Sequence, residues 1–272
     1  LLDGHTIPAC ECYKVFMSMS VEINSRVSRH IMEASLKDGL YDVANMAVER
    51  LMKSGFTADL RMYTLILSCF SRCEVMDKEA LIMSMLSSTN HSAHKFLCGL
   101  LTSPEQRNDS ALNFVRSYFE SLEHEKLARW FTCVLLNYLV LMGQIKRARC
   151  VWKVAYEKKL FPNRILFDQE LVWSLDVRAL SIGAALTAIV HTLHRFRKRM
   201  IHYHTIPRRI KIVTGSTLND PIQDLLKPLD SPFENHGGAL RCRGAYVAQW
   251  FNKPIVEKFL ENELPSRDEL VM

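Results

Sequence analysis

The chain has 272 residues, of which 48% are hydrophobic and 24% charged, and its formal net charge is +6. This length allows two domains with apolar cores. Because no uncharged apolar run reaches about 18 residues, we expect no membrane-spanning segment. The chain begins with Leu1, so we expect a mature or trimmed product, and its eight cysteines are predicted to be thiols in a reducing compartment.

Residues 1–170 are predicted to be almost wholly helical, because apolar residues recur at three- and four-residue spacing between turn signals. Gly39 precedes Ala44 at the same spacing as Gly143 precedes Ala148, and the two pairs lie 104 residues apart. One third of this distance is about 35 residues, a period typical of helical repeat arrays. We expect each glycine to end the first helix of a unit and each alanine to let the second helix approach closely.

Two further repeat units, both degenerate, are predicted between Gly39 and Gly143. One opens at Leu60 to Ile66 and has Ala80 in its second helix, and the other comprises His94 to Leu101 and Ala111 to Leu122. The lengths of these units differ from 35 by several residues, but their apolar residues recur with the same helical periodicity. The fold predicted for this part is therefore an α-helical repeat solenoid of stacked hairpins.

The array resembles the pentatricopeptide repeat, which opens with Tyr-x-x-Leu-Ile, has Gly-x-x-x-x-Ala at its centre and ends with Pro-Asp or Pro-Asn. Tyr63 to Ile66 is a compressed form of the opening, Gly39 to Ala44 and Gly143 to Ala148 match the centre, and Pro162-Asn163 matches the end. The resemblance implies reading of single-stranded RNA at one base per repeat. Base-reading positions would be held by Asp59, Thr64, Cys133 and Asn163, with Arg29 an atypical occupant. The alternative is that the repeats only pack and hold a partner.

The pattern changes after residue 163, where strands as well as helices are expected. In chain order we predict a strand over 171–178, a helix from the N-cap Ser181 to about His202, a strand over 209–214, a short helix opened by Asp220-Pro221 and running to about Leu229, one or two strands within 239–251, and a helix over 255–264. Two strands joined by a helix imply a parallel crossover. The predicted fold of residues 171–272 is a small α/β two-layer sandwich.

The positive charge is concentrated in one stretch. Between Val177 and Asn219 there is no Asp or Glu but there are eight cations, so the rest of the chain carries a net charge of −2. A solvated surface normally mixes both signs, and a field of one sign indicates a polyanionic partner. The predicted nucleic-acid contacts are His191, Arg195, Lys198, Arg199 and His202 on one face of the long helix, Arg208, Arg209 and Lys211 on the second strand, and Thr214, Gly215 and Ser216 at the turn after it.

Leu175-Asp176-Val177-Arg178 and Ile212-Val213-Thr214-Gly215 resemble motifs of the small MutS-related (Smr) domain. Together with the upstream repeats, they resemble the plant organellar proteins that join pentatricopeptide repeats to such a domain. The resemblance implies a βαβα-type sandwich, RNA or DNA binding and, in some members, endonuclease activity. Arg178 stands where the general family has histidine, and Thr217 replaces the second glycine of Thr-Gly-x-Gly. A β-branched residue there obstructs the close approach of a phosphate to the backbone, which weighs against cleavage.

Catalysis therefore stays open. In a metal-free nuclease, Asp176 would move a proton and Arg178 would stabilise the phosphorane, whereas in a binding domain Asp176 would only cap or pair and Arg178 would bind phosphate. No Walker-type loop, Ser-His-Asp order or paired-carboxylate motif occurs. The histidines at 191, 194, 202 and 204 have no cysteine or carboxylate at ligand spacing, so no metal site and no cofactor is expected.

These features predict an organellar RNA-binding protein that acts in RNA processing, stabilisation or expression. The repeats would select the site and the basic domain would grip the phosphate backbone. The expected partners are single-stranded RNA and other proteins of an organellar gene-expression complex, with no membrane, and the expected location is the chloroplast, with the mitochondrion as the alternative. Two other functions stay open: a structural subunit of a large organellar nucleoprotein assembly, and a metal-independent RNA endonuclease.

Overall fold

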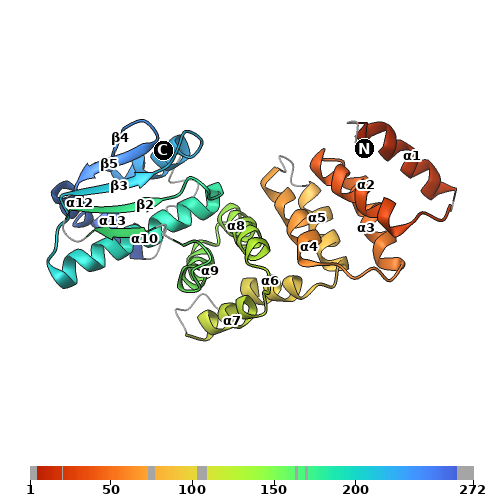
Figure 1. The fold of residues 1–272 in the computed structure, drawn as a ribbon, viewed down its shortest axis with the longest axis horizontal. Helices are drawn as coiled ribbons and strands as arrows, with labels where there is room; N and C mark the ends of the chain where they lie inside the picture. Colours follow the sequence, from red (N-terminus) through yellow and green to blue (C-terminus); the bar gives the residue numbers. More distant parts are fainter. Residues whose placement is uncertain are drawn as a thin grey trace. The chain divides into compact units, whose positions relative to one another are not determined.

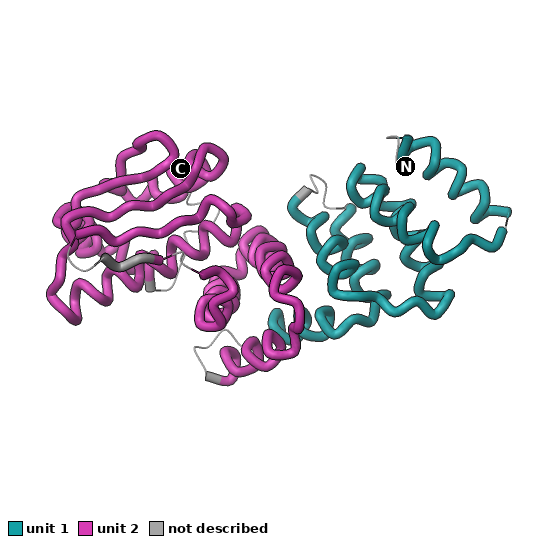
Figure 2. The backbone as a smooth tube through the Cα atoms, viewed as in Figure 1, with its two compact units in different colours: residues 1–104 teal, residues 105–272 magenta. Residues whose placement is uncertain are grey.

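The structure is a computed structural model that describes residues 5–19, 21–72, 77–102, 109–162, 165–168 and 171–261. The chain divides into two compact units, residues 1–104 and residues 105–272 (Figure 2). The change of domain that we expected between residues 170 and 171 therefore lies inside the second unit. The fold is mostly helical with a small sheet towards the C-terminal end, as predicted. In the part of the chain that the structure describes, no helix has the length and apolarity needed to cross a bilayer.

The first unit consists of helices in its described residues (Figure 1). They are α1 (Thr6–Ser18), α2 (Ser25–Lys37), α3 (Tyr41–Lys53), α4 (Leu60–Ser68) with a 3₁₀ turn at Cys69–Arg72, α5 (Asp77–Ser88) and α6 (Ser92–Thr102). Asn24 caps α2 by accepting a 2.7 Å hydrogen bond from the amide of Arg26, and Asp59 caps α4 in the same way. Gly39 follows α2 at a φ of +75°, and Ala44 of α3 is completely buried, which confirms the predicted roles of both residues.

The second unit opens with three further helices, α7 (Asp109–Glu120), α8 (Glu125–Leu141) and α9 (Ile145–Glu157). Gly143 lies between α8 and α9 at a φ of +67°, and Ala148 of α9 is completely buried, again as predicted. Helices α2, α4, α6 and α8 begin at residues 25, 60, 92 and 125, and thus 35, 32 and 33 residues apart. These intervals agree with the predicted repeat period and with the drift in the two middle units.

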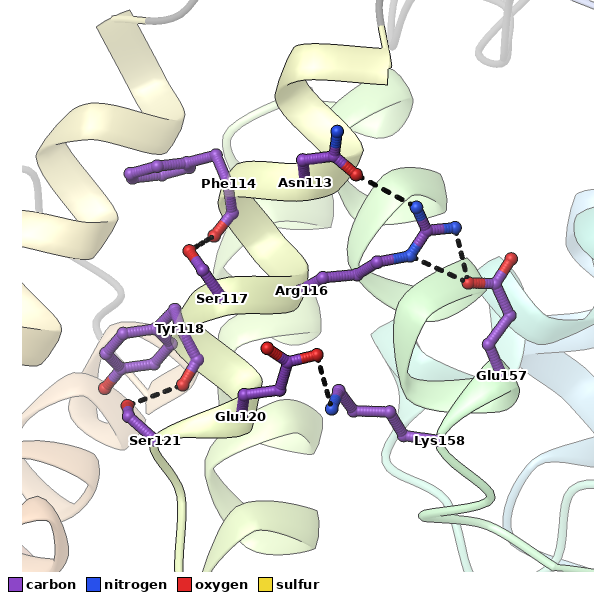
Figure 3. Close-up of polar contacts among 9 residues, drawn as sticks. All are labelled: Asn113, Phe114, Arg116, Ser117, Tyr118, Glu120, Ser121, Glu157 and Lys158. Atoms are coloured by element: carbon purple, nitrogen blue, oxygen red, sulfur yellow. Dashed lines mark hydrogen bonds and ion pairs between the residues drawn. The ribbon is translucent and has the colours of Figure 1, made fainter.

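Helices α7 and α9 are joined by exposed ion pairs (Figure 3). The Arg116 guanidinium donates to one Glu157 carboxylate oxygen at 2.8 and 3.2 Å, and Lys158 Nζ lies 3.4 Å from Glu120 Oε1. Arg116 also donates to the Asn113 side chain at 3.1 Å. Exposed pairs of this kind contribute at most about 1 kcal/mol each, so apolar packing carries most of the stability of this layer.

Within the described residues, the sheet has five strands in the order β1-β2-β3-β5-β4. The strands are β1 (Ile165–Asp168), β2 (Val172–Asp176), β3 (Arg209–Val213), β4 (Glu234–Asn235) and β5 (Ala239–Arg243). The accompanying helices are α10 (Ile182–Tyr203), α11 (Asn219–Leu226) with a 3₁₀ turn at Lys227–Leu229, α12 (Gly244–Phe251) and α13 (Pro254–Glu261). Strands β2 and β3 are parallel, which confirms the predicted crossover through α10, and the other neighbours are antiparallel.

Several elements differ from the expectations. Strand β1 was not predicted, and α11 begins at Asn219 with Leu218 as its N-cap, so Asp220 lies in the first turn instead of capping the helix. Residues after 243 form a helix and not a second strand. Gly244 is the first residue of that helix, and a Cβ on it would lie 1.8 Å from the carbonyl oxygen of Pro207, so only glycine fits this close approach. The last predicted helix is described as far as Glu261, and residues 262–264 lie outside the described residues.

Helix α10 has neighbours on two opposite sides. Its Phe196 ring packs 5.4 Å from the buried Trp173 ring of β2, while its other side contacts α8 and α9. Two hydrogen bonds fasten this second contact: the Ser181 hydroxyl donates to the Cys133 carbonyl at 3.1 Å, and the Gly183 amide donates to the Asn137 side chain at 2.7 Å. The last helical hairpin therefore shares a compact unit with the sheet.

Candidate nucleic-acid interface

The predicted cations on α10 divide into two groups by exposure. Lys198, Arg199 and His202 are exposed near the C-terminal end of the helix. The Arg199 guanidinium carbon lies 5.7 Å from the centre of the Trp173 ring and 5.4 Å from that of the Tyr203 ring. Stacking on two aromatic rings orients this guanidinium without neutralising its charge. These three side chains are therefore open to solvent, and their contact with a nucleic acid stays a prediction.

The other group lies at the contact with α9. The Arg195 guanidinium carbon is 4.8 Å from the centre of the Tyr156 ring, and His191 lies beside the same tyrosine at 5.9 Å. Burial, followed by the charges of Arg195 and Arg149, lowers the pKa of His191 to about 3. A neutral, packed imidazole supplies no positive charge to a phosphate, so the expected cationic role of His191 is corrected to a packing role.

Strands β3 and β5 carry a second group of cations, and the arginines of β5 were not predicted. Burial alternates along β3 and along β5 from Leu240 onward. The exposed positions include Arg209 of β3 together with Arg241 and Arg243 of β5, while Lys211 is half-buried. Arg208, just before β3, is exposed as well. The alternation in Ala239–Arg243 is a signal for the arginines of β5, but their place beside β3 depends on the strand order.

Asp176 and Arg178 form a pair at the end of β2. The Arg178 side chain donates to both Asp176 carboxylate oxygens, with Nη2–Oδ2 at 2.7 Å and Nε–Oδ1 at 3.1 Å, and the Arg178 amide also donates to Oδ1 at 3.1 Å. This hydrogen bond and the charge of Asp176 raise the pKa of Arg178. The Arg178 side chain is 61% exposed, so it can still contact an anion at its open edge.

The turn after β3 lies next to this pair. A Cβ on Gly215, which has a φ of +70°, would lie 3.4 Å from Cγ of Arg178, and Gly238 approaches Gly215 equally closely. The amides of Thr214 and Gly215 both donate to the Gly238 carbonyl at 2.9 Å. They are therefore engaged within the fold, which corrects the expectation that the Gly215 backbone is available to a phosphate. Thr214 is buried and supports the turn, whereas Ser216 is exposed.

The predicted base-reading residues have different environments. One Asp59 oxygen accepts from the Met62 amide at 2.7 Å, and the other lies 3.3 Å from Nη2 of Arg29, so two predicted positions form an ion pair. Thr64 is completely buried and its hydroxyl donates to the Leu60 carbonyl, which corrects its expected contact with a base. Cys133 is half-buried and its carbonyl faces α10. Asn163 lies outside the described residues.

Within the described ranges, no group of three or more His, Cys, Asp or Glu side chains is arranged to hold a metal ion. The surface of the second unit thus offers exposed guanidinium and ammonium groups, one exposed hydroxyl at a turn and a paired carboxylate. These groups can bind an anionic polymer through its phosphates.

No protein-family model matches the chain. A pentatricopeptide repeat-containing protein of Arabidopsis thaliana that is named as mitochondrial is 54% identical over 258 residues, which are 94% of this chain and 31% of the relative. A second such protein of the same plant is 29% identical over 190 residues, 64% of this chain and 22% of the relative. A third, named as chloroplastic, is 25% identical over 222 residues, 76% of this chain and 15% of the relative. The chain spans 31% or less of the length of these relatives.

Proposed function

We propose that the chain, whose homologues support a place among the plant pentatricopeptide repeat-containing proteins, binds RNA in an organelle. The observation that carries this proposal is the concentration of cations on α10 and β3, in a stretch with no acid between Val177 and Asn219. Lys198, Arg199, Arg208 and Arg209 of this stretch are exposed. Such a concentration of positive charge suits a polyanion, and RNA is the polyanion that the repeat family implies.

The two parts of the chain have different roles in this proposal. The helical hairpins select the RNA segment, and the sheet-containing part, which we assign to an Smr-like domain, grips the backbone. Support for the assignment comes from the packing of Gly215 against Arg178, which brings together the two motifs that resemble that domain. The position at which the protein binds a transcript would determine whether it affects processing, stabilisation or expression of that RNA.

The mitochondrion is the organelle that the similarity favours over the chloroplast that we first expected. The relative with 54% identity is named as mitochondrial, whereas the relative named as chloroplastic is 25% identical. Fluorescent tagging of the full-length protein in plant cells tests this choice. Exclusive plastid fluorescence would overturn it.

We propose binding and not cleavage for the Asp176–Arg178 pair. The Arg178 guanidinium donates through Nη2 to Oδ2 of Asp176 at 2.7 Å, and the nearby amides of Thr214 and Gly215 donate to the Gly238 carbonyl. The Thr214 and Gly215 amides are then not available to stabilise the charge of a phosphorane. Incubation of the protein with labelled RNA should leave the RNA intact, and cleavage that disappears on Arg178→Ala would instead support the endonuclease.

The experiment for RNA binding uses the full chain and the variant with Lys198→Glu and Arg208→Glu, both at exposed positions. We expect the wild type to bind single-stranded RNA with an affinity that falls steeply with salt, and the double variant to bind at least tenfold more weakly. Lys227→Glu is the matched control, because it reverses an exposed cation that lies between Asp224 and Asp230 in the sequence. Equal affinities of all three proteins, or no binding by the wild type, would contradict the proposal.

A further inference from the structure

Four cations face one another in pairs across β3 and β5. In the antiparallel register Arg209 lies opposite Arg243, and Lys211 lies opposite Arg241. The residues between them, Ile210, Ile212, Leu240 and Cys242, are buried on the other face of the sheet. We call the side that carries these four cations the basic sheet face, and it is the face opposite to α10 because Trp173 of β2 contacts α10 from the other side.

This arrangement is unfavourable for folding by itself. Like charges directly opposite each other in an antiparallel pair destabilise a sheet. Among the described residues, none of the four cations takes part in an ion pair. Two carboxylates of this face have described side chains, and each has another neighbour. Asp176 is held by Arg178, and Glu234 lies opposite Arg241 but has Oε2 3.4 Å from Nε2 of His236.

We infer that the basic sheet face binds the phosphate backbone of single-stranded RNA, an inference that rests on the RNA binding proposed above. Neighbouring strands are about 4.8 Å apart and alternate residues of a strand about 6.7 Å apart, so the four charges occupy one small rectangle. A polyanion that lies across it meets several cations at once and releases its counterions. The bound phosphates would also relieve the repulsion between the paired cations.

On its three central strands, the basic sheet face carries no described side chain suited to stacking on a base. Its other members on the three central strands are Val172, Ser174, Asp176, Val213 and Ala239, and none of them is aromatic. Without a stacking surface, contacts to the backbone position an RNA but do not specify its sequence. The inferred role of this face is therefore a sequence-independent grip that adds to any selection by the helical repeats.

The test compares the full chain with a variant that carries Arg241→Ala and Arg243→Ala. The Kd for a single-stranded RNA is measured between low and physiological salt by a binding titration. We expect a loss of affinity of at least tenfold at low salt, equal for RNAs of different sequence. The slope of log Kd against log salt should fall by about 1.4, since each phosphate contact to a single strand contributes about 0.7.

Two controls separate charge from structure. The variant with Arg241→Lys and Arg243→Lys keeps both charges, so its slope should match the wild type. Lys227→Ala removes an exposed cation outside this face and should change neither affinity nor slope. Thermal melting distinguishes binding from a structural role. If the two arginines only stabilised the fold, the double alanine variant would melt at a lower temperature. Because the loss of Arg241 and Arg243 relieves repulsion, we expect its melting temperature to stay the same or to rise.

Each result has a distinct meaning. If the wild type binds no RNA, the proposed function and this inference both fail. If the wild type binds RNA and the double alanine variant binds with the same affinity and slope, only this inference fails. Loss of binding to poly-glutamate with unchanged RNA affinity would assign the face to an acidic protein and overturn the inference. A lower melting temperature, with affinity lost equally in the lysine variant, would also overturn it.

Discussion

Ser181 and Gly183 show how single residues fasten α10 to the preceding hairpin. Ser181 is the N-cap of the helix, as predicted, but its hydroxyl donates to the Cys133 carbonyl and not to its own helix. Two residues later, Gly183 lets the backbone of α10 come close to the backbone of α8 at Asn137. A Cβ at this position would lie 2.7 Å from Cα and 2.9 Å from the amide nitrogen of Asn137. These are backbone atoms, so the contact cannot relax by turning a side chain.

Gly183→Ala should therefore lower the free energy of unfolding by about 1–3 kcal/mol, the usual cost of overpacking a tight contact. Urea denaturation followed by circular dichroism measures the change. Ile182→Ala is the control, since this neighbouring side chain is 52% exposed and its truncation should cost no more than about 0.5 kcal/mol. Equal stability of the Gly183→Ala variant and the wild type would show that α8 and α10 can move apart to accommodate the added methyl group at little cost in free energy.

At the scale of elements, the contact between α9 and α10 encloses an imidazole among cations. His191 is surrounded by Arg195 and His194 of its own helix and by Arg149 and Lys153 of α9. Its Nε2 is buried and has no hydrogen-bond partner in the described residues. Burial and like charge both disfavour protonation, so the folded protein holds this side chain neutral far below its ordinary pKa.

This depressed pKa makes the stability of the second unit depend on pH. Well above pH 6.5 His191 is neutral in both the folded and the unfolded state, so it contributes nothing to the pH dependence. As the pH falls from 6.5 towards about 3, the unfolded chain takes up a proton that the folded chain refuses, so stability is lost. The slope approaches about 1.4 kcal/mol per pH unit, or about 1 kcal/mol between pH 7 and 5.5.

His191→Asn should remove this share of the pH dependence, and denaturant titrations at pH 7 and 5.5 measure it. His202→Asn is the matched control on the same helix, because that side chain is exposed. If both variants lose stability on acidification as the wild type does, His191 titrates normally and its packed, neutral role is incorrect.

At the scale of the whole molecule, the last helical hairpin belongs with the sheet. The unit boundary lies at Pro104 and Glu105, upstream of α7, α8 and α9. Helix α10 buries Thr187 and Val190 on the side away from Ile189 and Phe196, and α8 and α9 are its neighbours there. A sheet-containing part that begins at residue 171 would leave this side of α10 in water.

Residues 105–272 should therefore melt in one cooperative transition, whereas residues 171–272 alone should melt at least about 10 °C lower, on a scale of about 4–8 °C per kcal/mol for so small a domain. Thermal scans by circular dichroism compare the two fragments. Equal melting temperatures would return the domain boundary to residue 170.

The sequence by itself determined most of the secondary structure. Helical periodicity, Gly39, Gly143 and the absence of acids between Val177 and Asn219 are local features, and each predicts a local outcome without knowledge of its neighbours. Residues 239–251 mark the limit, because an apolar segment after a glycine is compatible with either a strand or a helix until its packing is known.

The tertiary structure alone decided which charges are exposed and which face one another. The cations and histidines of α10 share one pattern in the sequence, but packing against α9 left Lys198 exposed and made His191 neutral. Arg209 and Arg243 are far apart in the chain, and the antiparallel pairing of β3 and β5 brought them together. The charge of a side chain follows from its residue type. The burial of that side chain and the charges around it depend on contacts between distant segments, and no local sequence pattern encodes those contacts.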